Sequence, residues 1–269
     1  MTSFFTCPVC GSALNGDKTF KCPNNHSFDK NKHGYLNLLM SNASASKRHG
    51  DDRLMVLARS EFLQKGYYAP VREALTEALT KHARQGMRIL DAGCGEGWYT
   101  AYFAQQLKDY APAVAGVDIS KDALRQAAKR GLTELAVAST AKLPAASESC
   151  DAVLNIFSPP ELKEFRRVLK EDGVLIRALP MENHLLGLKQ AVYDTALLNP
   201  APIKDIEGYE LSDATPVQYE ITVQDEDIWN LFTMTPYYYK TGKADQEKLK
   251  ALDTLTTQVE ILVLTYKKG

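Results

Sequence analysis

Apolar and polar residues alternate along the chain in a way that predicts strands followed by helices. An apolar run at Ile89 and Leu90 predicts a buried strand, and the apolar spacing that begins at Trp98 predicts a helix. Similar runs predict further strands at 113–118, 135–138, 151–157, 173–179, 217–223 and 259–266, and helices at 98–109, 121–130, 161–170, 183–197, 225–233 and 244–256. This order predicts an α/β fold with a doubly wound sheet of the nucleotide-binding kind.

The first of these strands leads into a glycine-rich turn. Asp91 ends the strand, and Gly93, Gly95 and Gly97 follow at alternate positions. Glycine suits a backbone that must turn sharply or lie against a ligand, because it has no Cβ. Asp118 ends the next apolar run, where a carboxylate can accept both hydroxyls of a ribose. The string D-x-G-x-G-x-G differs in spacing from the dinucleotide fingerprint G-x-G-x-x-G. The alternative to a ligand-binding turn is a tight turn with a structural role only.

These motifs resemble motif I and the acidic second strand of class I S-adenosylmethionine (SAM) methyltransferases, which have a Rossmann-like sheet of seven strands. The resemblance implies that the glycines admit the amino-acid part of SAM and that Asp118 binds its ribose. Positions beside these motifs join the expected cofactor site, namely Glu96, Ile119, Ser139 and Asn155. In the class, Ser139 falls where adenine is contacted, and the stretch 155–160 falls where the methyl acceptor lies.

Length and cysteine content limit the domain organisation. The 269 residues, 45% of them hydrophobic, allow one large domain with or without a small module. No signal-peptide pattern and no membrane-spanning run is present, so the cytosol is the expected compartment. Three of the five cysteines crowd into the first 22 residues, which argues for a metal site and against a disulfide framework.

The N-terminal cysteines have the spacing of a zinc site. Cys7 and Cys10 form a C-x2-C pair, and Cys22 and His26 form a second pair eleven residues later. Three thiolates and one imidazole suit a closed, structural zinc ion, and the spacing resembles a zinc ribbon. A free C-x-x-C redox pair is the alternative. We therefore predict a zinc module over 1–40 and a methyltransferase domain over 41–269. That domain would begin with a linker at 41–53 and lead into its core through helices within 54–85.

Charge is distributed unevenly along the chain. The net charge is −1, but residues 1–85 carry 12 Lys and Arg against 7 Asp and Glu, a net charge of +5, so the rest carries −6. A basic front indicates a polyanion bound there, and Lys47, Arg48 and Arg53 could contact RNA. A solvated loop is the alternative for this run.

The combination of a zinc module and a methyltransferase core resembles the RlmA-type family of 23S ribosomal RNA (guanine-N1)-methyltransferases. The string G-Y-L-N-L-L after the zinc ligands, the string D-x-G-C-G-E-G-x-Y-T and the string M-T-P at 234–236 carry this resemblance. It implies zinc at the four ligands above, a 23S rRNA hairpin as substrate and a homodimer. It also implies SAM contacts at Tyr68, Tyr99, Thr100, Asp118, His184 and Leu185. For Tyr68, packing between two helices is an equal alternative.

The expected chemistry requires positioning of the guanine more than covalent help. The proton on guanine N1 must leave, so a proton acceptor is expected. Asn155 could orient the base edge, and Glu161 could accept the proton, although a carboxylate in the first turn of a helix is commonly structural. Extrusion of the base would let Phe157 and Pro159 stack on it, with ordinary packing as the alternative. A small-molecule methyltransferase and a non-catalytic zinc-ribbon RNA-binding protein are the competing functions.

Overall fold

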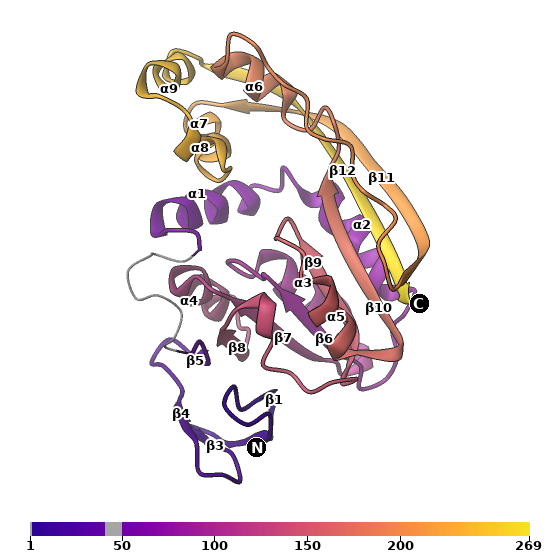
Figure 1. Cartoon of the computed structure of the whole chain (residues 1–269). Helices are drawn as coiled ribbons and strands as arrows, with labels where there is room; N and C mark the ends of the chain where they lie inside the picture. Colours follow the sequence, from indigo (N-terminus) through magenta and orange to yellow (C-terminus); the bar gives the residue numbers. More distant parts are fainter. Residues whose placement is uncertain (1, 41–49) are drawn as a thin grey trace.

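The strand predicted at Ile89 and Leu90 is β6 (Arg88–Ala92), which lies inside an eight-stranded sheet (Figure 1). The computed structural model describes residues 2–40 and 50–269. The strand order is β11-β12-β10-β9-β6-β7-β8-β5, with parallel pairing from β5 to β10 and antiparallel pairing of β10 with β12 and of β12 with β11. The remaining strands are β5 (Leu36–Asn37), β7 (Ala113–Asp118), β8 (Glu134–Val137), β9 (Cys150–Ile156), β10 (Leu169–Pro180), β11 (Tyr209–Gln224) and β12 (Thr254–Lys268). All seven predicted strands are present, and β5 is added.

The helices of the described chain are α1 (Arg53–Gln64), α2 (Ala69–Thr80), α3 (Trp98–Gln106), α4 (Lys121–Lys129), α5 (Leu162–Val168), α6 (Leu186–Val192), α7 (Glu226–Thr233), α8 (Tyr237–Lys240) and α9 (Lys243–Lys250). Two predicted helices extended at least five residues past the observed end. The helix expected over 183–197 ends at Val192, since Tyr193 is extended. The helix expected over 244–256 ends at Lys250, because the β-branched residues from Thr254 onward pair with β11.

A small four-stranded sheet precedes the large one, with the order β1-β2-β3-β4. Its strands are β1 (Thr2–Thr6), β2 (Ala13–Gly16), β3 (Thr19–Lys21) and β4 (Ser27–Asp29). The chain then passes to the large sheet, where β5 pairs with β8 at the edge. Leu36 of β5 and the nearby Leu38 pack in the same buried cluster as Phe5 and Leu14 of the small sheet. The domain boundary at residue 40 stays a prediction.

The predicted linker falls mainly on residues 41–49, so Lys47 and Arg48 lie outside the described part of the chain. Its end is described: Gly50–Asp52 lead directly into α1, where Arg53 is exposed. The helices predicted between 54 and 85 are α1 and α2. Ser120 caps α4, because its Oγ accepts a hydrogen bond from the Ala123 N–H at 3.2 Å.

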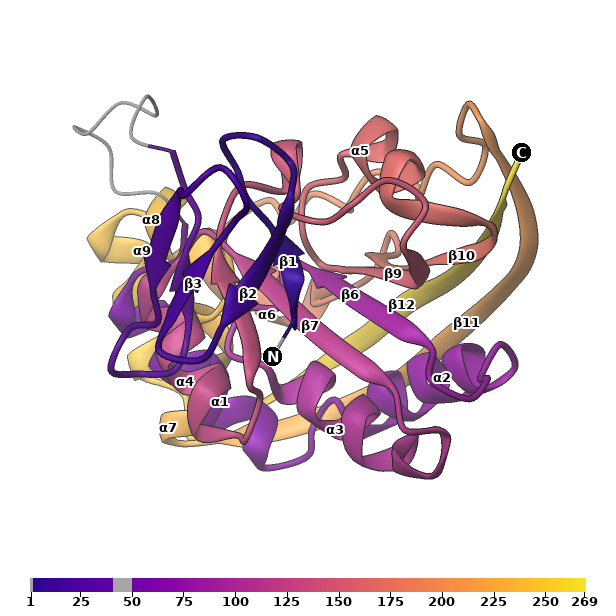
Figure 2. The same cartoon turned by 90° about the horizontal axis from the view of Figure 1, so that it is seen from below.

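The two faces of the large sheet are covered by different kinds of structure. Alternate residues of each strand point to opposite faces. Ile89 and Leu154 pack against α1, α2, α3, α6 and α7, whereas Leu90 and Val153 pack against α5 and the small N-terminal sheet. Seen from below, the small sheet lies across β6 and β7 (Figure 2). The zinc module therefore covers part of a face that helices cover in a doubly wound fold.

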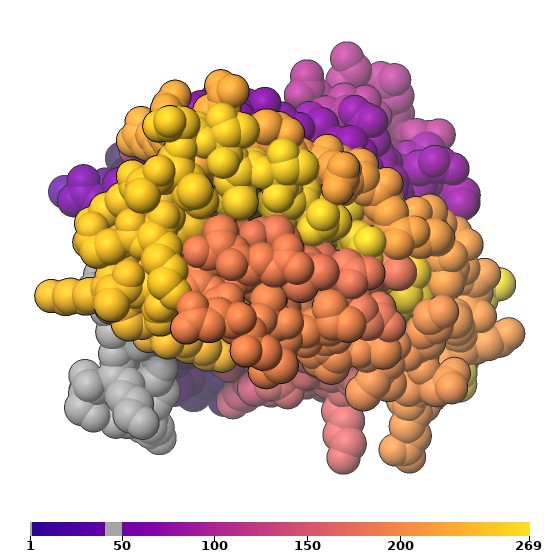
Figure 3. All heavy atoms as spheres, turned by 90° about the horizontal axis from the view of Figure 1, so that it is seen from above, coloured from indigo at the N-terminus to yellow at the C-terminus, as the bar shows by residue number. Residues whose placement is uncertain are grey.

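The C-terminal part of the chain builds the upper face of the molecule, where the ribbon β11–β12 extends beyond the parallel strands. Figure 3 shows this face, coloured orange to yellow. The loop between α6 and β11 carries the exposed apolar residues Leu197 and Ile203, which are 75% and 74% exposed. Among the described residues, no helix combines the length and apolar character needed to cross a membrane.

Candidate functional site

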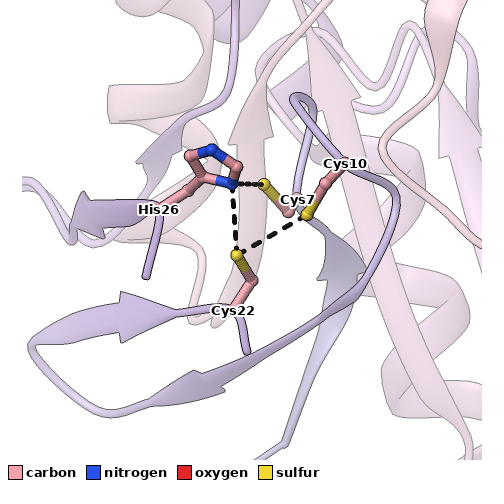
Figure 4. Close-up of side chains that lie close together, drawn as sticks. All are labelled: Cys7, Cys10, Cys22 and His26. Atoms are coloured by element: carbon pink, nitrogen blue, oxygen red, sulfur yellow. Dashed lines mark hydrogen bonds between the residues drawn. The ribbon is translucent and has the colours of Figure 1, made fainter. Parts of the chain in front are cut away.

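Three cysteines and one histidine converge in the N-terminal module. The ligand atoms of Cys7, Cys10, Cys22 and His26 all lie within 4.8 Å of one another (Figure 4). His26 Nδ1 is 3.5 Å from Cys7 Sγ and 3.3 Å from Cys22 Sγ, and the Sγ atoms of Cys10 and Cys22 are 3.6 Å apart. Tetrahedral zinc, with Zn–S near 2.3 Å and Zn–N near 2.0–2.1 Å, separates its ligands by about 3.5–3.8 Å. The donor set and its spacing therefore fit zinc, as predicted.

Two tight turns present these ligands. The Gly11 N–H donates to Cys7 O at 2.8 Å, and the Asn25 N–H donates to Cys22 O at 2.9 Å. Gly11 and Asn25 have φ values of +75° and +61°, a left-handed conformation that glycine and asparagine tolerate best. Hydrogen bonding to Ser12 lowers the pKa of the Cys10 thiol to about 5, which favours the thiolate that a metal binds.

The glycine turn after β6 places backbone N–H groups beside Asp118. Gly93, Gly95 and Gly97 all have positive φ, from +55° to +97°, so the turn requires glycine. The Gly95 N–H donates to Asp118 Oδ2 at 2.9 Å, and the Ser120 N–H donates to Asp118 Oδ1 at 2.7 Å. Burial raises the pKa of the Asp118 carboxyl, and these two N–H groups oppose that rise. The ends of β6 and β7 thus form one polar site, as the sequence indicated.

Two buried oxygens beside this turn find no hydrogen-bond partner among the described residues: Asp91 Oδ1 and the Tyr99 hydroxyl. Thr100 Oγ1 donates to the other oxygen of Asp91 at 2.6 Å. Burial raises the pKa of Asp91 to about 7 and raises that of Tyr99 as well. An unpaired polar atom in a protein interior is costly, so both oxygens indicate a ligand with polar groups.

An aromatic cluster lines the site above the end of β9. The ring centroid of Tyr68 lies 6.2 Å from that of His184 and 6.4 Å from that of Phe157. The ring centroids of Phe157 and Tyr99 are 6.3 Å apart. The Glu260 N–H donates to His184 Nδ1 at 3.3 Å, so the proton lies on Nε2, which is 3.4 Å from the Tyr68 hydroxyl. Burial lowers the pKa of His184 to about 3, which keeps the imidazole neutral.

The other predicted cofactor residues have partners of their own. The Glu96 carboxylate pairs with Arg130 at 2.5 Å, Ser139 Oγ accepts from the Ala141 N–H at 3.2 Å, and the Leu185 N–H donates to Gln258 O at 2.8 Å. The side chain of Ile119 lies against Gly50. Contact of Glu96, Ile119, Ser139 and Leu185 with the cofactor stays a prediction.

The acceptor stretch 155–160 is a loop held from within. Asn155 is fully buried, and its Nδ2 donates to Ser158 O at 3.0 Å and to Ser158 Oγ at 2.6 Å, while its Oδ1 accepts from Arg177 Nε at 3.2 Å. The Asn155 carboxamide therefore holds the loop in shape and does not reach the surface. Ser158 Oγ in turn donates to Ala92 O at 2.8 Å, which ties the loop to β6.

Phe157 stands out in this loop. Its φ is +52°, a conformation that is costly for a bulky side chain, and the residue is 42% exposed. Glu161 is half-buried at the start of α5, where its carbonyl accepts the Glu164 N–H at 2.9 Å. Sequence reasoning missed two residues beside the glycine turn that have no periodic signal. Ser158 lies in the acceptor loop and binds Ala92 O, and Arg59 Nη1 of α1 is 4.0 Å from the position that a Cβ of Gly95 would occupy.

Comparisons with known proteins agree with this geometry. A zinc-ribbon family model described as "RlmA, N-terminal" matches residues 5–47, and a model described as "Methyltransferase domain" matches residues 89–173. YxjB of Bacillus subtilis, which carries the provisional name of a 23S rRNA (guanine-N(1)-)-methyltransferase, is 32% identical over 97% of this chain and 96% of its own length. The 23S rRNA (guanine(748)-N(1))-methyltransferase of Streptomyces fradiae is 33% identical over 70% of this chain and 68% of its own length.

The fold, the glycine turn and the Cys3His cluster define a SAM-dependent methyltransferase with an N-terminal zinc ribbon. More narrowly, the chain belongs to the RlmA-type family of 23S rRNA (guanine-N1)-methyltransferases.

Proposed function

We propose that this protein transfers a methyl group from SAM to N1 of a guanine in a hairpin of 23S rRNA. The two unpartnered buried oxygens beside the glycine turn carry the proposal, since they lie where the polar groups of a cofactor would bind. Two observations support RNA as the substrate: the chain belongs to this family, and its zinc ribbon lies in the first third of the sequence, which has a net positive charge.

The residues present fit SAM. Asp91 Oδ1 lacks a donor, and the α-ammonium group of SAM would supply one. Asp118 would hold the ribose hydroxyls, because its carboxylate is already oriented by two backbone N–H groups. The remaining proposed contacts are Tyr68, Gly93, Gly95, Glu96, Gly97, Tyr99, Thr100, Ile119, Ser139, Asn155, His184 and Leu185. When bound, SAM supplies an activated methyl group, so the protein's task is to orient the guanine in line with it.

Asp118→Ala should weaken SAM binding by about 1–3 kcal/mol, the cost of losing hydrogen bonds to a charged group. Calorimetric titration with SAM measures this loss. Asp118→Asn is the matched variant, because it keeps one acceptor oxygen and should bind with intermediate affinity. Unchanged affinity in Asp118→Ala would contradict the assignment of the ribose site.

The acceptor guanine would enter from the side of the 155–160 loop. A base inside a helix hides its N1 edge, so the enzyme must act on an extruded or unpaired guanine. Phe157, an exposed aromatic residue, would offer a stacking surface beside the cofactor residues Tyr68 and Tyr99. Asn155 keeps this loop in place, and Glu161, at its end, is the proposed acceptor for the N1 proton.

The product identifies the reaction. We expect RNA incubated with enzyme and isotope-labelled SAM to yield labelled 1-methylguanosine when its nucleosides are analysed by mass spectrometry. Because an N1 methyl group blocks base pairing, reverse transcription should stop at the modified guanine and reveal its position. Label in another nucleoside would show that the enzyme methylates a different atom of the RNA. Label in small metabolites alone would favour the small-molecule alternative, and RNA binding without label would favour the non-catalytic one.

The same proposal places the protein in the cytoplasm, where its ribosomal substrate lies, and includes a homodimer. Light scattering of the purified protein tests the homodimer, which requires a mass of twice 29.9 kDa.

A further inference from the structure

A short segment crosses the loop that follows Asp118. This segment, Gly50–Asp52, is called the strap below. A Cβ atom at Gly50 would lie 2.7 Å from Ile119 Cγ2 and 3.2 Å from Ser120 N, and Gly50 has φ of +78°. Ser120 Oγ donates to Asp51 O at 2.7 Å. The backbone of the strap therefore packs directly on this loop, with no room for a side chain at Gly50.

Arg59, on the second turn of α1, holds the strap from the other side. Its Nη1 forms an ion pair with Asp51 Oδ2, and its Nη2 donates to Met234 O at 2.9 Å. Met234 follows the end of α7, so a single guanidinium joins the strap, α1 and the C-terminal part of the chain. A second tie runs alongside, since the Tyr239 hydroxyl donates to Asp52 Oδ2 at 2.5 Å.

This junction lies at the edge of the cofactor site. Arg59 Nη1 is 4.0 Å from the position that a Cβ of Gly95 would occupy. Burial raises the pKa values of Asp118 and Glu96; the Arg59 charge opposes this rise at both groups, whereas the Asp51 charge adds to it at Asp118. The ion pair is thus close enough to the carboxylate proposed to hold the ribose for both of its charges to act on it.

We propose that Arg59 is a positioning residue that keeps the strap closed over the Asp118 loop and thereby slows the release of SAM. The inference rests on the proposed function, because it assumes that SAM binds at Asp118. The side chain of Arg59 is 26% exposed, so its ion pair is partly shielded from water and its hydrogen bond to Met234 O adds direction. Loss of this anchor frees the strap without removing any atom proposed to touch the cofactor.

The test measures how fast SAM leaves the enzyme. Full-length protein is loaded with tritiated SAM, chased with excess unlabelled SAM, and sampled by rapid filtration. We expect Arg59→Ala to release SAM about tenfold faster than the unmodified protein, the effect of losing one charge-assisted anchor. Gly50→Ala should also speed release, because its Cβ pushes the strap away from Ile119 and strains the backbone. Arg59→Lys should restore part of the slow release.

Lys65→Ala is the matched control. Lys65 caps the C-terminal end of α1, at the other end of this helix from the strap, and also binds the α7 region, through Asp227. Its variant should lose comparable thermal stability and keep slow release. If SAM release is accelerated equally in Arg59→Ala and Lys65→Ala, Arg59 contributes only to general stability and the proposal is overturned. An unchanged rate of release in both Arg59→Ala and Gly50→Ala would overturn it as well. Failure of the unmodified protein to retain any SAM would instead overturn the proposed function.

Discussion

Removing zinc will destabilise the large sheet as well as the first forty residues. Phe5 and Leu14 of the module pack in one buried cluster with Leu90, Val117 and Val153 of the large sheet, and the zinc ligands Cys7 and Cys22 belong to the same cluster. Structural zinc contributes about 10–16 kcal/mol to the folding of small zinc modules. We expect a strong chelator to lower the unfolding free energy of the whole protein by at least about 3–5 kcal/mol, the cost of uncovering a large core side chain.

The connection between β8 and β9 explains this dependence. Among the described residues, it contains only a short 3-10 turn, Thr140–Lys142, and no α-helix that could cover the sheet. The module fills this position and is hydrogen-bonded there. The Thr6 N–H donates to Pro144 O at 2.8 Å, and Arg88 Nη2 donates to Phe4 O at 3.2 Å. Without zinc, apolar residues of β6 and β7 would face water.

Hydrogen exchange localises the effect. After chelation, or in Cys22→Ala, amide protection should fall in β7 and β8 as well as in residues 2–40. Cys10→Ala is the comparison, because the Cys10 side chain is exposed and its loss removes a zinc ligand without removing core volume. Similar losses in both variants would assign the effect to zinc. Faster exchange confined to residues 2–40, with an unchanged unfolding temperature, would contradict the prediction.

The zinc site could be predicted from the sequence because its geometry is local. A C-x2-C pair forms from a single turn, and Cys22 and His26 lie only four residues apart. The meeting of the glycine turn with Asp118 was also predictable, since the carboxyl ends of neighbouring parallel strands share one edge of a sheet. In both cases, the spacing along the chain determines the spacing in space.

Contacts between segments that are distant in the sequence could not be predicted from the pattern of apolar and polar residues. Arg59 and Met234 are separated by 175 residues, and the Asn155 carboxamide is occupied partly by Arg177, 22 residues later on the neighbouring strand. Hydrophobic periodicity predicts which face of an element is buried but not which side chain will meet a given polar group. The Asn155 carboxamide thus also holds the loop, and its expected role in orienting the base edge stays a prediction.

Replacing Phe157 should remove most activity on RNA while leaving SAM binding intact. Stacking of a base on an aromatic ring contributes about 1–3 kcal/mol, so Phe157→Ala should lower kcat/KM for RNA by about 10- to 100-fold. The affinity for SAM should change little, because the cofactor residues Asp91 and Asp118 have their contacts elsewhere. Methyl transfer to a 23S rRNA hairpin and calorimetric titration with SAM measure the two quantities separately.

Three further variants separate stacking from backbone strain at this position. Phe157 has φ of +52°, which glycine adopts without cost, so Phe157→Gly should keep the loop conformation and still lose activity. Phe157→Leu keeps an apolar side chain against Tyr68 and Tyr99 but has no ring to stack, whereas Phe157→Trp enlarges the ring. We expect activity in the order Trp, Leu, Gly. A fully active Phe157→Leu would show that packing of the loop, and not stacking on the guanine, explains why a bulky residue occupies a strained, half-exposed position at the end of β9.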